Sequence, residues 1–309
     1  MRDTHPDSKL RRLLKSQFAL SDLQIARIIA RAPSAYKSYN IKKKNGGHRR
    51  ISQPARETKA IQYWLIEKVF SHFEEHPCAT AYKHHSSIKT NAIAHSKSSY
   101  FLKLDFEDFF PSITSTDIVR FLSESKIKLG SDDLKDLARL VCIKGKNGLN
   151  LSIGAPSSPK ISNILLYNFD STIHEWCTSN DVTYTRYADD ITFSSSTVGM
   201  TPIIEEKLLE VLNDLEYPKL KLNPKKRHSL SKKDRVTITG INITSENNLS
   251  TGRERKRHIR SKVYQHLEKG LKESEKLKLR GLISFVEFIE PGFKLKLRKK
   301  YGSNSDLGI

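Results

Sequence analysis

The chain has 309 residues, of which 37% are apolar and 28% charged, a composition typical of a globular protein with a large polar surface. No apolar run is long enough to cross a membrane, and the N-terminus lacks the apolar core of a signal peptide. The three scattered cysteines, Cys78, Cys142 and Cys177, argue against a disulfide scaffold or a zinc ribbon. We therefore expect a cytoplasmic location and no membrane partner.

The net charge of +20 is concentrated at the two ends of the chain. Residues 1–60 contain 15 Lys and Arg against 4 Asp and Glu, and residues 251–309 contain 16 against 7. Residues 61–250 are balanced, with 23 residues of each sign. Basic segments on either side of a neutral centre favour a polyanionic partner, most commonly nucleic acid. The alternative is a basic protein without such a partner.

The hydrophobic pattern predicts helices at both ends and alternating strands and helices between them. In chain order we expect helices over 9–31 with a break at Ser21-Asp22, a basic hairpin over 36–54, a helix over 57–73, a buried strand over 99–106, and a helix capped at 114–117. Further on we expect a helix over 132–143, a hairpin or loop over 145–154, a helix that opens within 155–159 and runs through 176, two strands within 182–195, a helix over 202–217, strands within 234–250, and basic helices over 253–300 interrupted near Gly270, Gly281 and Pro291-Gly292. The expected class is α+β or α/β.

Three carboxylates stand where strands are expected to end. Asp105 closes a strand, and Asp189 and Asp190 form the tip of a hairpin. Adjacent carboxylates repel one another, and a divalent cation such as Mg²⁺ would relieve that repulsion and recruit phosphates. A solvated turn is the alternative, because Asp is common in turns. The apolar strand-forming residues on both sides favour a position where a sheet meets a cleft.

The sequence Tyr187-Ala188-Asp189-Asp190 resembles the reverse-transcriptase signature. Further blocks match in the same order, at Arg49–Pro54, Leu102–Ile113, Gly154–Pro159 with Ser162-Asn163, and Leu220–Lys226. Asn91-Ala-Ile-Ala-His95 and Ile238-Thr239-Gly240 resemble two elements of bacterial retron reverse transcriptases. A local hydrogen-bonding role and an RNA contact both remain open for Asn91 and His95.

The resemblance implies a right-hand polymerase of the α+β class. Its domains would be N-terminal helices and fingers over 1–98, a palm over 99–240 with a fingers insertion at about 125–155, and a helical RNA-binding thumb over 241–309. The activity would be RNA-directed DNA synthesis. Asp105, Asp189 and Asp190 would be the catalytic residues and would bind two Mg²⁺ ions.

The resemblance also assigns a nucleotide site. Lys43 and Arg50 would bind the triphosphate, with Arg49 as the alternative to Arg50. The alternative for all three residues is a solvated basic hairpin without a ligand. Phe110 would be an aromatic gate against ribonucleotides, or else a core residue. The floor of the nucleotide pocket would be formed by Ala155 and Pro156. Where the family usually has Leu-Pro-Gln-Gly, this chain has Leu151-Ser152-Ile153-Gly154, so a polar contact to the nucleotide is missing or supplied elsewhere.

A cation-rich segment is expected to bind RNA, unless it is only a solvated helix, through Arg253, Arg255, Lys256, Arg257, Arg260 and Lys262. The resemblance implies a cognate noncoding RNA as template and primer, deoxynucleoside triphosphates, a single-stranded DNA product joined to RNA through a 2′-OH, and antiphage defence with a separate effector protein. The alternatives are another bacterial reverse transcriptase, group II-like or defence-associated, and a vestigial nucleic-acid-binding scaffold. An RNA-directed RNA polymerase would typically carry Gly-Asp-Asp at the hairpin.

Overall fold

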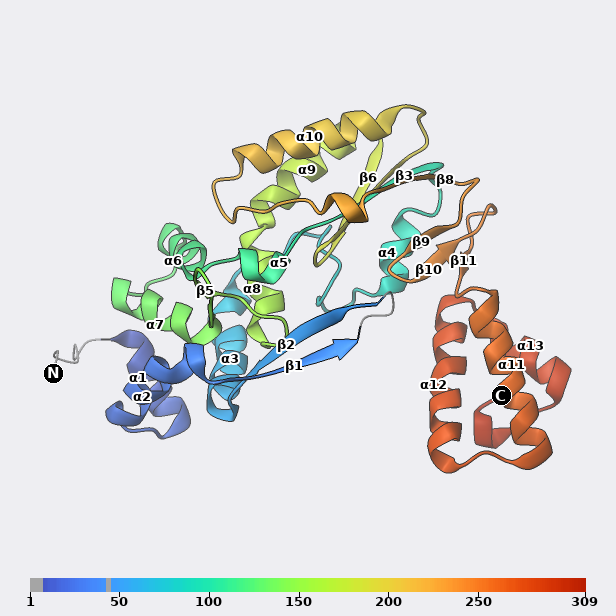
Figure 1. Cartoon of the computed structure of the whole chain (residues 1–309), viewed down its shortest axis with the longest axis horizontal. Coiled ribbons are helices and arrows are strands. Elements are labelled where there is room, and N and C mark those ends of the chain that lie inside the picture. The colour runs from blue at the N-terminus through green and yellow to red at the C-terminus, as the bar shows by residue number, and fades with distance from the viewer. Residues whose placement is uncertain (1–7, 43–45) are drawn as a thin grey trace.

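The structure is a computed structural model that describes residues 8–42 and 46–309 (Figure 1). Its N-terminal part begins with two helices separated at Ser21, whose side chain forms a capping box with Gln24, as the expected break requires. A long antiparallel hairpin follows. The elements of this part are α1 (Lys9–Phe18), α2 (Asp22–Arg31), η1 (Ala32–Ser34), β1 (Tyr36–Lys42), β2 (His48–Pro54), α3 (Arg56–Lys68), η2 (Phe70–His72) and α4 (Ile88–Ala94).

The centre of the chain forms a four-stranded antiparallel sheet in the order β6-β7-β3-β8. α9 and α10 cover one face of this sheet and contact β6 and β3 (Figure 1). The elements are β3 (Tyr100–Asp105), α5 (Phe109–Ser112), α6 (Ser115–Glu124), α7 (Ser131–Val141), β4 (Ile143–Gly145), β5 (Gly148–Asn150), α8 (Ser157–Leu165), α9 (Tyr167–Ser179), β6 (Val182–Tyr187), β7 (Asp190–Ser195), α10 (Met200–Asp214), η3 (Pro224–Lys226) and β8 (His228–Ser231).

The C-terminal part is a small sheet followed by a lobe of three helices (Figure 1). Its elements are β9 (Val236–Ile238), β10 (Ile241–Ile243), β11 (Leu249–Ser250), α11 (Arg253–Lys269), α12 (Glu273–Ile289), α13 (Phe293–Tyr301) and η4 (Ser305–Leu307). Among the helices of the described residues, none is long and apolar enough to cross a membrane.

Two apolar cores and a small cluster between them hold these parts together. The larger core runs without a break from Leu10 of α1 to Leu220 after α10, so the N-terminal helices, the α6–α7 region and the sheet share it. The C-terminal helices bury a core of their own. A small cluster that includes Phe101 of β3, Ile241 of β10 and Ile289 of α12 joins the sheet to the C-terminal lobe. The division into residues 1–98, 99–240 and 241–309 stays a prediction.

Most expected elements are present, and three details differ. The expected break at Gly281 is wrong, because Gly281 lies inside α12, where burial of Leu279, Ile283 and Val286 outweighs a glycine cost of about 1 kcal/mol. The single helix expected to open within 155–159 and run through 176 is two helices separated at Leu166. The strand β8 was not expected, because its sequence His-Ser-Leu-Ser is largely polar. It forms because it pairs with the free edge of β3.

Candidate functional site

The sheet brings the three carboxylates together. Asp105 at the end of β3 is the register partner of Asp190 at the start of β7. The backbone N–H of Phe106 donates to the carbonyl of Asp189 at 3.0 Å, which ties the turn of the β6–β7 hairpin to the next strand. Ala188 adopts a left-handed backbone (φ 58°), so the chain reverses sharply just before the aspartate pair. Residues far apart in the sequence therefore meet at one edge of the sheet.

The cluster carries strong mutual repulsion. Burial first, and then the nearby Asp105 carboxylate, raise the pKa of Asp189 above its ordinary value. Burial, the Asp189 charge and a hydrogen bond with Asp105 raise the pKa of Asp190. Nearby cations offset part of this repulsion: Lys226 Nζ lies 2.6 Å from Asp105 Oδ1, and the charge of Lys103 acts to lower the pKa of Asp190. Within the described ranges, no three or more His, Cys, Asp and Glu side chains are already arranged to hold a metal ion.

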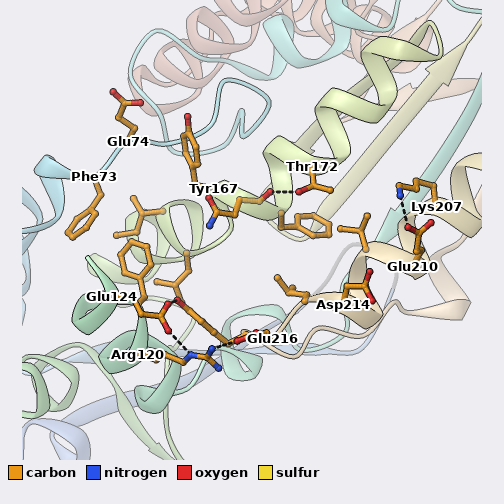
Figure 2. Close-up of a pocket in the computed structure, with 18 residues that line it drawn as sticks. Phe73, Glu74, Arg120, Glu124, Tyr167, Thr172, Lys207, Glu210, Asp214 and Glu216 are labelled. Atoms are coloured by element: carbon orange, nitrogen blue, oxygen red, sulfur yellow. Dashed lines mark hydrogen bonds and ion pairs between the residues drawn. The ribbon is translucent and has the colours of Figure 1, made fainter. Parts of the chain in front are cut away.

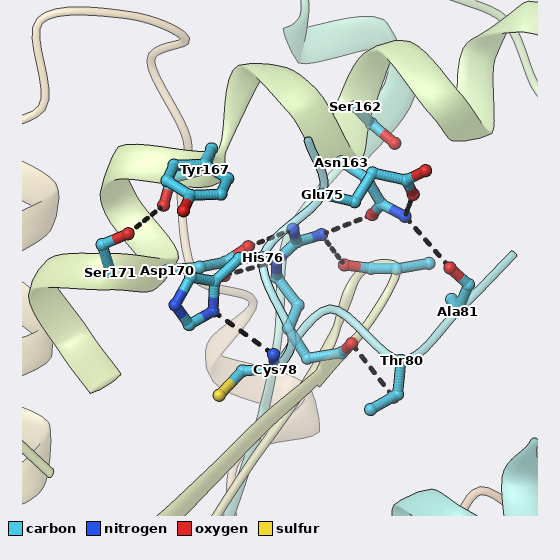
Figure 3. Close-up of polar contacts among 12 residues, drawn as sticks. Glu75, His76, Cys78, Thr80, Ala81, Ser162, Asn163, Tyr167, Asp170 and Ser171 are labelled. Carbon is cyan, nitrogen blue, oxygen red and sulfur yellow. Dashed lines mark hydrogen bonds and ion pairs between the residues drawn. The ribbon is translucent and has the colours of Figure 1, made fainter. Parts of the chain in front are cut away.

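Asp170 of α9 and Arg186 of β6 form a fully buried ion pair, and Figure 3 shows Asp170 among its polar neighbours. Arg186 of β6 donates from Nε to Asp170 Oδ1 at 2.8 Å and from Nη2 to Asp170 Oδ2 at 2.5 Å, and both side chains are inaccessible to solvent. Tyr184 donates to the same carboxylate at 2.7 Å. Arg186 Nη1 donates to the carbonyl of Ala188 at 3.3 Å and to Asn163 Oδ1 at 3.3 Å. This guanidinium thus connects α8 and α9 to the turn that precedes the aspartates.

The β1–β2 hairpin lies close to the carboxylates. Arg49 and Arg50 pair with Ile41 and Asn40 of β1 and so point to opposite faces. Arg50 Nη2 lies 3.4 Å from Ser38 Oγ, whereas the positive charge of Arg49 acts to lower the pKa of Asp189. Of the two arginines, Arg49, the alternative candidate, is thus the one whose charge acts on Asp189. Lys43 lies outside the described residues.

The segment with the unusual isoleucine packs against β2. The backbone N–H of Ser52 donates to the carbonyl of Ile153 at 2.7 Å, and the Ile153 side chain packs on the main core. Gly154 has φ 109°, and a Cβ there would lie 2.7 Å from Ile51 Cγ2, so this position requires glycine. The missing glutamine thus leaves an apolar contact with the core in its place.

The remaining residues expected to contact the nucleotide lie in α5 and just before α8. Phe110 is 9% exposed and packs edge-to-face on Phe109 with ring centroids 5.2 Å apart, so it combines core packing with a small accessible edge. Ala155 is buried, and Pro156 is the half-buried N-cap residue of α8.

Tyr82 is a site residue that the sequence did not single out. The backbone of residues 78–80 pairs with Arg186 at the outer edge of β6, which brings the next turn of chain to the hairpin. The Tyr82 ring lies 6.4 Å from that of Tyr187, and burial and the Asp189 charge raise its pKa.

The basic helix α11 divides its cations between two roles. Arg253, Arg257 and Arg260 are exposed and stand at i, i+4 and i+7 on one face. Arg255 lies over the Phe285 ring at 4.9 Å, and Lys256 pairs with Glu290 at 2.7 Å. Lys262 contacts Glu275 at 3.3 Å. Three of the six candidate cations thus also hold the C-terminal helices together.

The two segments that resemble elements of retron reverse transcriptases, Asn91–His95 and Ile238–Gly240, contact one another. His95 is fully buried between Ser194 and Thr185, at 2.7 Å from each hydroxyl, and burial lowers its pKa to about 3. Asn91 accepts from Thr80 at 3.1 Å, and its amide lies 3.5 Å from Thr239 of the second element. Both residues have local hydrogen-bonding roles. They fix α4 to the β6–β7 hairpin and to the strands that lead to the C-terminal lobe.

Comparison with known proteins agrees with this geometry. A family model described as reverse transcriptase (RNA-dependent DNA polymerase) matches residues 41–243. The retron Ec83 reverse transcriptase of Escherichia coli is 40% identical over 281 residues, covering 89% of this chain and 90% of that protein. The retron Ec73 reverse transcriptase of the same species is 34% identical, covering 88% and 89%. Telomerase from Candida albicans, solved with a TWJ fragment of telomeric RNA, shares the fold with a TM-score of 0.51 at 11% identity, covering 94% of this chain and 59% of that chain.

Proposed function

Since this chain belongs to the retron reverse transcriptases and is an RNA-directed DNA polymerase, we propose that it copies a cognate structured noncoding RNA into single-stranded DNA. The observation that carries this proposal is the meeting of Asp105, Asp189 and Asp190 at one edge of the sheet. The same fold with this cluster intact also argues against a vestigial scaffold.

The three carboxylates are proposed to hold two Mg²⁺ ions. The donor set fits, because oxygen ligands suit this ion, and because burial together with repulsion from neighbouring carboxylates raises the pKa of Asp189 and Asp190, an electrostatic cost that a cation offsets. Lys226, bonded to Asp105, already marks a position where positive charge is favoured. When bound, the ions would activate the primer hydroxyl and stabilise charge on the α-phosphate and the leaving pyrophosphate.

The protein's own residues position the reactants. Arg49, in place of Arg50, is proposed to bind the triphosphate together with Lys43, because its charge acts on Asp189 and guanidinium groups match phosphate oxygens. Phe110 would place its accessible edge against the sugar and so exclude a ribose 2′-OH. Ala155 and Pro156 would form the floor beneath the nucleotide.

RNA recognition is assigned to the exposed face of α11. Arg253, Arg257 and Arg260 are free to contact phosphates, and 2′-hydroxyls would distinguish RNA from DNA. Membership of the retron group supports priming from an RNA 2′-OH, a branched RNA–DNA product, and a cytoplasmic role in antiphage defence with a separate effector protein.

Primer extension tests the metal role. Asp189→Ala combined with Asp190→Ala is expected to abolish extension while RNA binding survives. The matched control, Glu206→Ala with Glu246→Ala, removes two exposed carboxylates elsewhere and should extend at the wild-type rate. Extension retained by the first variant would refute the assignment.

Sequencing of the nucleic acid that copurifies with the protein tests the substrate. A branched molecule, with DNA joined to an internal guanosine of an RNA encoded beside the gene, is expected. Linear DNA on unrelated RNAs would instead favour another class of bacterial reverse transcriptase.

A further inference from the structure

A cavity lies away from the catalytic carboxylates, between the C-terminal end of α6, the start of α9 and the end of α10 (Figure 2). Its volume is about 660 Å³, within the range of ligand-binding pockets. The floor is apolar and includes Phe121, Leu165, Phe169 and Val211. None of the three catalytic aspartates lines it. Its occupant would therefore leave the polymerase site free.

The rim of this cavity is acidic. Five carboxylates and only two cations line it. Arg120 is shared between Glu124 and Glu216 and lies 4.6 Å from the Tyr217 ring. Lys207 is paired with Glu210 at 2.6 Å.

Two rim carboxylates remain available to a ligand. Within the part of the chain that the structure describes, Glu74 and Asp214 form no ion pair or side-chain hydrogen bond, and both are exposed. They come from separate elements, the loop after η2 and the end of α10.

This charge is opposite to that of the molecule as a whole, which carries +20. A polyanion bound to the basic hairpin and to α11 would be repelled from the cavity, so nucleic acid is a poor occupant. An apolar floor with unpaired carboxylates at the rim is complementary to an apolar side chain flanked by cations.

We propose that this cavity is the docking site for a basic segment of a partner protein. The segment inserts one aromatic or leucine side chain onto the apolar floor and places Lys or Arg against Glu74 and Asp214. The two sites are separate, so docking is compatible with continuing DNA synthesis.

The test is selection from a phage-displayed library of random peptides, panned on the full chain and counter-selected on a filled-cavity variant, Thr172→Trp. Thr172 is an exposed residue of α9 that lines the cavity, so the indole is accommodated without disturbing the core. We expect enrichment of peptides with an aromatic or leucine residue flanked by Lys or Arg. Binding of the best peptide is then measured by fluorescence anisotropy.

A rim variant, Glu74→Lys with Asp214→Lys, should weaken binding of that peptide at least tenfold. Thr172→Trp should weaken it by a similar factor. The matched control, Glu206→Lys with Glu246→Lys, makes the same charge change on exposed residues outside the cavity and should bind normally. All variants should retain primer extension and melting temperature. No enrichment, selection of acidic peptides, equal binding by the rim variant and the control, or binding of spermidine in place of any peptide would overturn the proposal.

Discussion

The buried Asp170–Arg186 pair makes a sharp prediction. Asp170→Asn would keep the shape of the side chain but remove its charge, so the guanidinium of Arg186 would remain buried without a counter-ion. Breaking a buried ion pair in this way costs about 3–5 kcal/mol, because neither solvent nor another anion compensates the charge. The upper part of that range is expected, since both side chains are at 0% exposure and the carboxylate also accepts from Tyr184.

Chemical denaturation measures this loss as a change in the free energy of unfolding. The control is Lys15→Gln, which breaks an ion pair whose side chains are 52% and 74% exposed and should cost no more than about 1 kcal/mol. A cost of less than about 1 kcal/mol for Asp170→Asn would refute the reasoning about the buried pair.

A triple variant separates stability from positioning. Asp170→Leu, Tyr184→Phe and Arg186→Met together replace the polar cluster by apolar groups of similar volume, which often restores stability. The carbonyl of Ala188 would still lack its donor, so we expect primer extension to stay low although unfolding recovers. Wild-type extension by this variant would show that Arg186 has no part in holding the catalytic turn.

Three further predictions concern the catalytic cleft and the RNA-binding helix. Because the pKa values of Asp189 and Asp190 are raised in the folded state, the pair's contribution to stability should fall as pH rises above about 4. Mg²⁺ should therefore raise the melting temperature more at pH 8 than at pH 5, and a variant with both residues changed to Asn should lose that difference. Phe110→Ala should increase ribonucleotide incorporation in single-nucleotide extension assays, and unchanged selectivity would remove the gate assignment. Arg257→Gln should weaken RNA binding and reduce its salt dependence by about one phosphate contact, whereas Lys256→Gln should mainly lower stability by unpairing Glu290; equal effects on RNA would contradict this division.

Local sequence signals predicted the elements well because each has a local cause. Ser21 caps a helix through its own side chain, and Gly46 and Gly47, both with positive φ, stand just before β2 in the hairpin expected over 36–54. The interruption expected at Gly281 is absent because burial of the opposite face of α12 outweighs the low helix propensity of glycine. β8 was missed because a partner strand, and not its own composition, stabilises it.

That the three proposed catalytic aspartates lie together could be predicted, because each stands where an expected strand ends. Their supports could not, since nothing near Asp170 in the sequence indicates that it meets Arg186. Strand alternation places Arg49 and Arg50 on opposite faces, but only the tertiary arrangement decides which face meets the cleft. Similarly, charge density on α11 did not distinguish Arg257 from Lys256, which is engaged by Glu290.

The pairing of Asp105 with Asp190 means that backbone hydrogen bonds set the spacing of the reactive groups. A slip of β3 by one residue along β7 would turn the Asp105 side chain to the other face of the sheet. Polymerase activity is therefore expected only when β3 and β7 are paired in the correct register. A partly assembled chain, even one with its helices formed, would have no residual catalysis, and the onset of synthesis during refolding should coincide with completion of the central sheet.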